Sequence, residues 1–316
     1  MTANDTFRAS GIMDLIGADD DLVCTGIAPC AHPIHRGLGG QSWRIHDRRS
    51  GERRFVKKLN PSSLADGVFA DIVQLAREAH APGLAPALLD TDAGSGVLVF
   101  EDLPETWHYG MVRDFRGPML AGTAVEALAA LHRSAPLSTA TSPFDRIRKL
   151  NEELARHAAE DRGILPEQYR TMSDWVERIE DALTAAGHDP APCKGECNLS
   201  DFMIGPEGQL RLVDFDRAAN GDPFADLGIF ANEVCRTERD IDGLVEAYCG
   251  HAGRAETART RLYMVVSAFH LGLWGLVSQL REPGTEIEFF KYGQNQFIRC
   301  RSALSRWDVG GILREI

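Results

Sequence analysis

The segment "CKGECNLSDFMIGPEGQLRLVDFD", residues 193–216, decides how this chain can be interpreted. The short hydrophobic runs FMI and LRLV flank the turn residues GPEGQ, a pattern that predicts a β-hairpin. A hairpin returns the chain to its starting point, so side chains just outside its two strands should lie close together. Four acidic side chains surround these runs: Glu196, Asp201, Asp214 and Asp216.

Carboxylates at the base of a hairpin are suited to binding a divalent cation. Mg²⁺ prefers oxygen ligands, and proteins usually share it with the phosphate groups of a substrate. We therefore expect Asp201 and Asp214 to bind Mg²⁺, with Glu196 in the preceding loop facing a substrate hydroxyl. An ordinary solvated turn would carry the same residues, so the rest of the chain must discriminate between the two interpretations.

The bulk composition sets limits on the class of protein. The chain has 316 residues, of which 44% are hydrophobic, and this length favours about two lobes or domains. A net charge of −12 argues against a broad nucleic-acid-binding face. The seven cysteines show no zinc spacing, so we expect thiols in a reducing compartment and a cytoplasmic protein.

Two segments bear on membrane targeting. The N-terminal sequence MTANDTFRASGIMDLIGADDD lacks a basic region followed by an apolar run, so we do not expect a signal peptide. Residues 262–280 carry no formal charge, but their length is marginal for a membrane span. We predict a buried core helix there and no membrane insertion.

The predicted secondary structure changes from mainly strands to mainly helices near residue 103. Residues 23–103 contain several strand-like runs and one helical pattern, whereas residues 104–316 are mainly helical apart from the hairpin. In GDPFADL, Asp222 is a good N-cap and Pro223 suits the first helical position. We predict an α+β fold with an extension at 1–22, a small β-rich lobe and a larger helical lobe.

Three motifs at fixed spacing carry a family resemblance. The runs KGECNLSD, VDFD and GDPFADL resemble the catalytic segment of the aminoglycoside phosphotransferase and choline/ethanolamine kinase superfamily, which has a protein-kinase-like fold. The family pattern is His-Gly-Asp, four residues, Asn, a hairpin, Asp-Phe/Trp-Asp/Glu, and Gly-Asp-Pro-x-x-Asp-Leu. The resemblance extends from about residue 25 to about residue 305. It implies a two-lobed kinase that uses ATP and Mg²⁺.

The chain departs from the family pattern at three positions. Lys194 replaces the family's His, Glu196 its catalytic Asp and Asp201 its metal-binding Asn, whereas Asp214 is kept as the main metal ligand. The resemblance assigns Glu196 and Asp214 to catalysis, and Asp201 and Asp214 to the metal. A carboxylate displaced by ~1 Å can cost about a hundredfold in rate. A nucleotide-binding family member with impaired catalysis is therefore an alternative.

The resemblance also assigns nucleotide contacts in the small lobe. In GLGGQSW, Gly39 and Gly40 belong to a loop that would cover the phosphates. In FVKKL, Lys57 and Lys58 point to opposite faces of a strand. Alignment with the family favours Lys58 as the lysine that binds the α- and β-phosphates, with Lys57 solvated.

Further family positions lie between these strands and the helical lobe. The acidic residue that would hold the nucleotide lysine is Asp71, with Glu78 as the second candidate. In VFEDLP, backbone groups of Glu101 and Leu103 would bond the adenine edge. His132, in LAALHRS, is expected to be structural.

The C-terminal region resembles the substrate site of choline/ethanolamine kinases. There, a Trp-containing helix and a Phe/Tyr segment enclose a quaternary ammonium group, and the matching positions are Trp274, Phe289 and Tyr292. A second family Trp falls at Leu271, so the aromatic box is thinner. Ring faces attract cations by about 0.5–2 kcal/mol each, and Asp216 could add to this attraction.

The resulting hypothesis is an ATP- and Mg²⁺-dependent kinase that phosphorylates a hydroxyl of a small amino alcohol such as choline or ethanolamine. The alternatives are an aminoglycoside or another small hydroxyl compound as acceptor, and the impaired family member. The sequence leaves both a monomer and a homodimer open.

Overall fold

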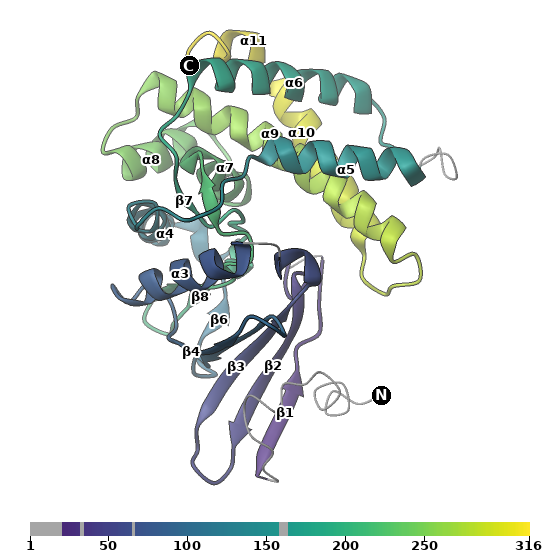
Figure 1. Cartoon of the computed structure of the whole chain (residues 1–316). Helices are drawn as coiled ribbons and strands as arrows, with labels where there is room; N and C mark the ends of the chain where they lie inside the picture. Colours follow the sequence, from purple (N-terminus) through teal and green to yellow (C-terminus); the bar gives the residue numbers. More distant parts are fainter. Residues whose placement is uncertain (1–20, 32–34, 65–66, 158–163) are drawn as a thin grey trace.

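The computed structural model describes residues 21–31, 35–64, 67–157 and 164–316. A β-sheet with one helix forms the N-terminal part, drawn in purple and blue, and helices dominate the rest (Figure 1). The predicted α+β class is confirmed. The predicted extension at 1–22 lies almost wholly outside the described residues.

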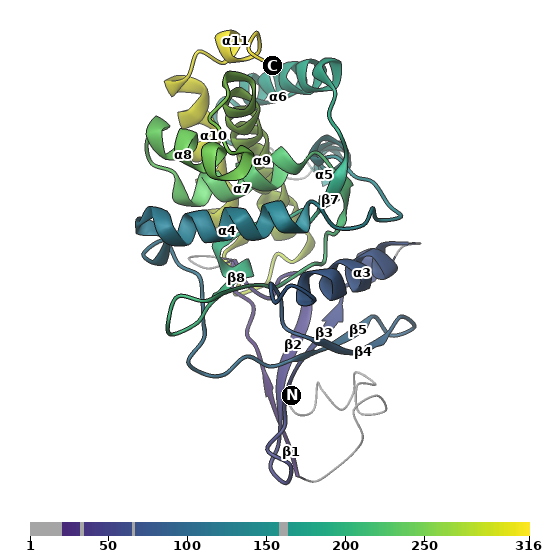
Figure 2. The same cartoon turned by 90° about the vertical axis from the view of Figure 1, so that its left-hand side faces the viewer.

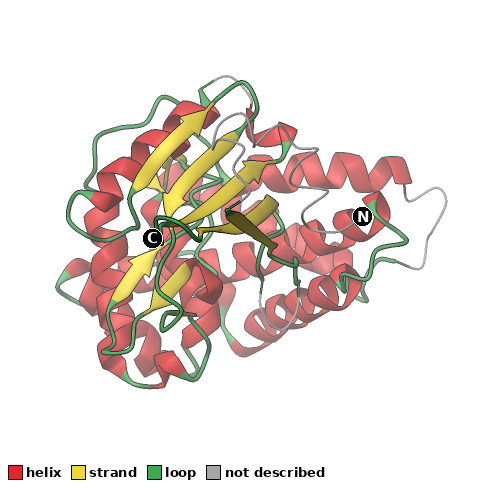
Figure 3. Cartoon of the chain, turned by 90° about the horizontal axis from the view of Figure 1, so that it is seen from below, coloured by secondary structure: helices red, strands yellow, loops and turns green. Residues whose placement is uncertain are grey.

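The N-terminal sheet has five strands, all antiparallel, in the order β1-β2-β3-β5-β4. Seen from below, its strands lie together in front of the helices (Figure 3). The central strand β3 pairs with β2 on one side and with β5 on the other. The bounds are β1 (Leu22–Gly26), β2 (Gly40–Asp47), β3 (Arg53–Leu59), β4 (Leu88–Asp92) and β5 (Val97–Glu101).

The two faces of this sheet have different neighbours. Trp43 and Val56 belong to a small core on one face. Leu59 and Leu98 belong to the main core, together with buried side chains of α3 (Val68–His80). Since side chains alternate along a strand, Lys57 shares the face of Leu59 and not that of Val56.

The predicted hairpin is confirmed, and two short pairings that were not predicted surround it. β8 pairs with β9 as expected, and β6 adds a third strand next to β8. β7 pairs with β10, which brings Cys193 opposite Ala219 and closes the segment between them into a loop. The bounds are β6 (His108–Tyr109), β7 (Ala191–Cys193), β8 (Phe202–Ile204), β9 (Leu210–Leu212) and β10 (Ala219–Gly221).

The helical part is arranged around the long helix α9 (Arg254–Arg281), which packs against α5, α6, α7, α8 and α10. As predicted, the Asp222 side chain caps α7 by accepting a hydrogen bond from the Phe224 N–H. The bounds are α4 (Pro118–Leu131), α5 (Pro143–His157), α6 (Tyr169–Ala186), α7 (Pro223–Val234), α8 (Glu238–Cys249), α10 (Phe289–Arg306) and α11 (Val309–Ile312), with the 3₁₀ turns η1 (Pro61–Leu64), η2 (Asp114–Arg116) and η3 (Leu199–Asp201).

Helix α9 contains the apolar run that raised the membrane question. Among the described residues it is the one helix long and apolar enough to cross a membrane, but 89% of its apolar window is buried inside the protein. The core of the helical part forms around it, with Phe269 and Leu273 fully buried. The helix therefore has the surroundings of a core helix, as its sequence indicated.

A buried carboxylate ties α3 to the helical part. α3 and α4 run across the middle of the molecule (Figure 2). Asp71, 1% exposed, accepts hydrogen bonds from the backbone N–H and the hydroxyl group of both Ser138 and Thr139. These four donors use both carboxylate oxygens, and their effect on Asp71 outweighs burial and lowers its pKa. Asp71 is thus a structural link between the two parts.

We expect Asp71→Ala to lower the free energy of unfolding by about 2–4 kcal/mol, because it removes four hydrogen bonds to a buried carboxylate. Asp71→Asn should lose less, since its amide keeps one acceptor oxygen. Urea denaturation measures the change, with the exposed Asp174→Ala as the control, expected within about 0.5 kcal/mol of wild type. Equal stability of Asp71→Ala and the control would contradict the structural role.

Candidate active site

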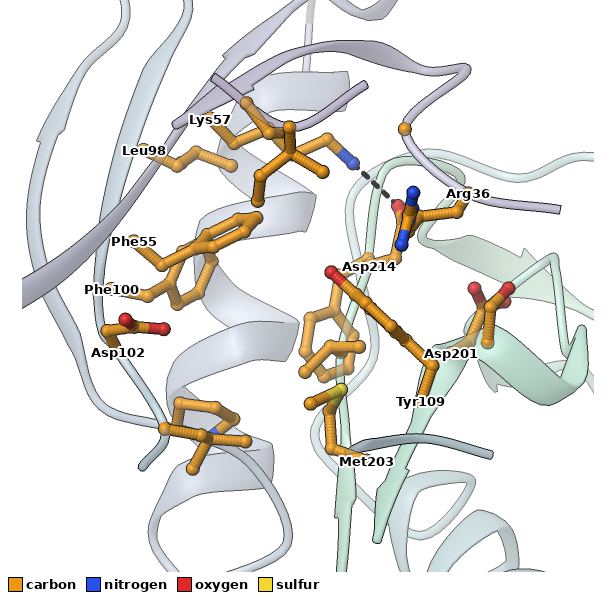
Figure 4. A pocket seen from close by; sticks show the side chains of 18 of the residues that line it. Arg36, Phe55, Lys57, Leu98, Phe100, Asp102, Tyr109, Asp201, Met203 and Asp214 are labelled. Atoms are coloured by element: carbon orange, nitrogen blue, oxygen red, sulfur yellow. Dashed lines mark hydrogen bonds and ion pairs between the residues drawn. The ribbon is translucent and has the colours of Figure 1, made fainter. Parts of the chain in front are cut away.

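A cleft lies between the N-terminal sheet and the hairpin. Its two ends differ in character (Figure 4). Phe55, Leu98 and Phe100 from the sheet face Met203 from the hairpin and form an apolar slot. The other end is polar and is lined by Lys57, Asp201, Asp214 and Asp216. A flat apolar group and a charged group can thus bind side by side.

The connection after β5 passes along the apolar end, and Glu101 and Leu103 both line the cleft. The Glu101 N–H donates to the Ala87 carbonyl at 2.9 Å, so this N–H is already used within the fold. In the described part of the chain, the Leu103 N–H has no backbone partner. Asp102 between them is held by Arg44 and Arg53, at 3.2 and 3.5 Å.

At the polar end the structure places Lys57, and not the predicted Lys58. The Lys57 ammonium lies 2.8 Å from an Asp214 oxygen and 2.6 Å from an Asp216 oxygen. Lys58 points to the other face of β3 and does not line the cleft. The physical reason is strand alternation: Lys57 shares its face with Phe55 and Leu59, which contact the cleft and the main core.

The two carboxylates beside Lys57 have opposite pKa shifts. Burial raises the pKa of both, but for Asp214 the charges of Lys57 and Lys194 outweigh burial and hold the pKa well below its usual value. Burial and the neighbouring charge of Asp214 raise the pKa of Asp216 to about 7. Asp214 is thus held as the anion. Its φ of 65° is in the left-handed region, which Asp tolerates better than most residues.

Three further predictions about this region have different outcomes. Gly39 and Gly40 lie at the start of β2, and a Cβ on Gly39 would stand 2.4 Å from an Asp216 oxygen, so glycine permits this close approach. Asp71 does not pair with a lysine but with Ser138 and Thr139, as described above. Glu78, the second candidate, accepts from the Ala135 N–H and also does not reach Lys57.

Asp216 was predicted to add to the attraction for a cationic substrate. It is 8% exposed and its carboxylate lies 2.6 Å from the Lys57 ammonium, next to Gly39. Its role toward a substrate stays a prediction.

The loop that carries Lys194 and Glu196 is anchored by Asp226, whose role the sequence did not reveal. Asp226 is fully buried and accepts from the backbone N–H groups of Lys194 and Gly195, at 2.7 and 2.9 Å. His132 contacts the same carboxylate at 3.1 Å, which agrees with its predicted structural role. Asp226 belongs to GDPFADL, so this motif was the signal that could have found it.

The substituted positions of the catalytic motif form a pair. The Lys194 ammonium, 0% exposed, lies 3.0 Å from an Asp201 oxygen and 2.9 Å from the Glu196 carbonyl oxygen. Its charge compensates part of the negative charge that Asp adds over Asn. Burial, with neighbouring Asp214 and Glu196, still outweighs Lys194 and raises the pKa of Asp201 to about 8.

Glu196 does not line the cleft. Its carboxylate is 16% exposed and accepts from Arg217 at 2.6 Å. Burial raises its pKa, but the electrostatic effects of Arg217, His35 and Lys194 together outweigh burial and lower the pKa overall. Glu196 in turn acts electrostatically on Asp201, at the polar end of the cleft, and on His35.

The aromatic residues of the C-terminal region come together as the family resemblance implied. The ring centroid of Trp274 lies 5.4 Å from that of Phe289 and 5.6 Å from that of Tyr292. Leu271, at the position of the missing second Trp, packs in the same cluster. His35 also contacts these rings, although no sequence pattern placed it in this group.

The donor set at the polar end fits Mg²⁺. Asp201 and Asp214 are both carboxylates on the cleft lining, and Lys194 and Lys57 each engage one oxygen of their partner, which leaves the second oxygen outside the lysine contacts. The described residues also hold a cluster of His132, Cys193 and Asp226 with metal-like spacing. There, Asp226 and His132 are engaged in hydrogen bonds to protein groups, so that cluster is structural.

Comparison with known proteins agrees with this geometry. Residues 31–263 match the sequence profile described as the phosphotransferase enzyme family. No curated protein matches the sequence. A choline/ethanolamine kinase family protein from Mesorhizobium loti has a similar structure, with a TM-score of 0.77, 21% identity, and coverage of 100% of this chain and 99% of that chain.

Two further structures have the same fold. A choline kinase from Streptococcus pneumoniae gives a TM-score of 0.71 at 17% identity, covering 96% of this chain and 99% of that chain. A macrolide 2'-phosphotransferase from Brachybacterium faecium gives 0.58 at 15% identity, with the same coverage. The fold and cleft thus define a kinase-like phosphotransferase. The chain belongs to the phosphotransferase enzyme family.

We expect Lys57→Met to weaken nucleotide binding about tenfold or more, since a charge-assisted hydrogen bond contributes about 1.5–3 kcal/mol. The neighbouring Lys58→Met is the matched control and should stay within about twofold. Titration with a fluorescent ATP analogue gives both affinities, and circular dichroism checks that each variant is folded. A larger loss for Lys58→Met would return the nucleotide role to Lys58.

At pH 9, above the raised pKa of Asp201, we expect Asp201→Asn alone to lower the free energy of unfolding by about 3–5 kcal/mol, because it leaves the buried Lys194 ammonium without a counter-charge. Combining it with Lys194→His, which recreates the family's pair of residues, should cost less than the sum of the single changes. A double-mutant cycle in urea measures the coupling, expected at about 0.5–3 kcal/mol. Additive effects would show that the two residues are energetically independent.

Proposed function

We propose that this protein uses ATP and Mg²⁺ to phosphorylate the hydroxyl group of a small amino alcohol. The observation that carries the proposal is the position of Lys57 and Asp214 at the polar end of the cleft, opposite an apolar slot. This arrangement suits a nucleotide whose base enters the slot and whose phosphates reach Lys57. The family and the similar structures support the class of reaction.

The nucleotide contacts follow from the cleft. The carbonyl of Glu101 and the N–H of Leu103 would bond the adenine edge, with Phe55 and Met203 on either side of the ring. Lys57 would leave part of its contact with Asp214 to hold the phosphates. A structure of the choline kinase from Streptococcus pneumoniae contains AMP, which supports a nucleotide in the corresponding cleft.

Asp201 and Asp214 would hold Mg²⁺, which would neutralise charge on the transferred phosphoryl group. The chain's own residues position the reactants. Lys57 fixes Asp214 as an anion, and Lys194 fixes the orientation of Asp201. Since phosphoryl transfer depends mostly on positioning and electrostatics, these ion pairs are the main contribution of the protein to the rate.

Glu196 would accept or orient the proton of the acceptor hydroxyl. Its lowered pKa keeps it ionised at neutral pH, which a proton acceptor requires. Arg217 holds the carboxylate in one orientation at 2.6 Å. This fixed geometry compensates in part for the longer side chain of Glu compared with Asp.

An amine-bearing acceptor is supported by the cluster of Trp274, Phe289 and Tyr292, since aromatic faces attract cations. The choline and ethanolamine kinases among the similar structures favour the same class. A second candidate is another hydroxyl compound, as the macrolide and spectinomycin phosphotransferases share the fold. The third is a nucleotide-binding protein with impaired catalysis, based on Lys194, Glu196 and Asp201. Cytoplasmic localisation and homodimer formation stay predictions.

A panel of acceptors with ADP release as readout tests this proposal. Choline, ethanolamine and their N-methylated relatives should raise ADP release above the level without acceptor, and an aminoglycoside, a macrolide and a sugar should not. Thermal unfolding with ATP and Mg²⁺ provides a second readout, because a ligand that binds the native state raises its stability. ATP-dependent stabilisation without turnover for any acceptor would favour the impaired family member.

We expect Asp214→Asn to reduce Mg²⁺-dependent ADP release by about a hundredfold or more, because it removes a charged metal ligand placed on the cleft lining. The protein should remain folded, since Asn keeps the shape of the side chain and tolerates the positive φ at this position. Steady-state kinetics over a range of MgCl₂ concentrations measures the effect. Turnover equal to wild type would remove Asp214 from the mechanism.

A further inference from the structure

The aromatic cluster contains a fourth ring, contributed by the N-terminal part. His35, which precedes β2, places its imidazole centroid 4.9 Å from the Trp274 ring and 5.1 Å from the Tyr292 ring. A cation bound to an aromatic face lies within about 6 Å of the ring centroid. The imidazole therefore lies within the distance range at which a cationic head group would contact both rings.

His35 has few polar contacts for its imidazole in this position. Its Nδ1 is buried and has no hydrogen-bond partner among the described residues. A buried polar atom without a partner costs about 1–3 kcal/mol. Burial also lowers the pKa of His35, so the ring is neutral and gains little of the electrostatic attraction that the aromatic faces offer a cation.

The backbone around His35 is, in contrast, well held. The Ser200 hydroxyl donates to the His35 carbonyl. Arg36 and Cys30 exchange two backbone hydrogen bonds, at 2.8 and 2.9 Å. A rotation about the side-chain bonds of His35 would thus expose the sides of the Trp274 and Tyr292 rings that the imidazole covers, while its backbone stays in place.

The geometry points to His35 as a specificity-determining residue, which packs against Trp274 and Tyr292 where a cation would contact them and is displaced by the acceptor. This inference rests on the proposed function. Only an acceptor that gains enough from the rings can displace the imidazole. The same cluster contains the apolar side chains of Ala31, Leu38, Leu271, Ile287 and Phe289, and the carboxylates of Glu196 and Glu233 act electrostatically on His35. We expect this site to favour a quaternary ammonium group over a primary one, because a primary ammonium loses more hydrogen bonds to water when it leaves solvent.

His35 also lines the nucleotide cleft, so it stands on the border between the two substrates. While the His35 ring occupies the site, the acceptor can bind only to the fraction of molecules in which the ring has moved away. The apparent affinity for the acceptor is reduced by that fraction. Removing the ring should therefore increase affinity for the acceptor and weaken the discrimination between acceptors. If the ring instead contacted the bound acceptor, removing it would decrease the affinity for the acceptor.

The test compares His35→Ala with wild type in steady-state kinetics, using choline and ethanolamine as acceptors at saturating ATP and Mg²⁺. His35→Ala should lower KM for both by about three- to tenfold, with the larger change for ethanolamine and with kcat within about twofold. His35→Phe, which keeps a ring in the site, should not lower KM. His46→Ala, an exposed histidine on β2, is the matched control and should leave KM unchanged.

A binding measurement without turnover completes the test. Calorimetric titration with tetramethylammonium should give a tighter Kd for His35→Ala than for wild type by a similar factor. An unchanged or increased KM and Kd in His35→Ala, with wild type active on amines, would overturn the inference and leave the proposed function intact. If neither protein responds to any amine while both bind ATP, the proposed function fails, and the inference fails with it.

Discussion

The arrangement of the cleft depends on one ion-pair cluster, in which the Lys57 ammonium lies between the carboxylates of Asp214 and Asp216. It connects the central strand of the sheet to the end of the hairpin, 157 residues further along the chain. Its energetic contribution is electrostatic, since a buried lysine or aspartate without its partner would be strongly destabilising. The same cluster sets the charge states of the two carboxylates, so folding and the chemistry of the polar end are linked.

Much of the candidate site could be predicted from the sequence because its determinants are local. The hairpin between residues 202 and 212 follows from alternation and turn residues, and a hairpin necessarily brings Asp201 near Asp214. The N-cap at Asp222 is equally local. The cluster around Trp274 follows from helical spacing together with family resemblance. Each of these predictions needed only the geometry of one or two neighbouring elements.

The remaining contacts join elements that are distant in the sequence, and local patterns do not determine them. Lys57 and Lys58 both lie on faces that carry apolar side chains, so the alternation by itself did not decide between them. The partners of Asp71 are two residues in a loop nearly 70 positions away. His35 reaches a helix more than 200 residues further on. Such pairs are set by how the sheet packs on the helices. This packing leaves no periodic pattern in a single sequence from which the pairs could be predicted.

The bonds of Asp71 also have a mechanical consequence. They couple α3 to the loop before α5, so α3 moves with the helical part although it belongs to the sheet by sequence. A rocking motion of the whole sheet-plus-helix unit would have to break four hydrogen bonds to a buried charge at once. For the proposed nucleotide, exchange would therefore require bending of the edge strand β1 and its neighbour β2, while α3 stays attached to the helical part.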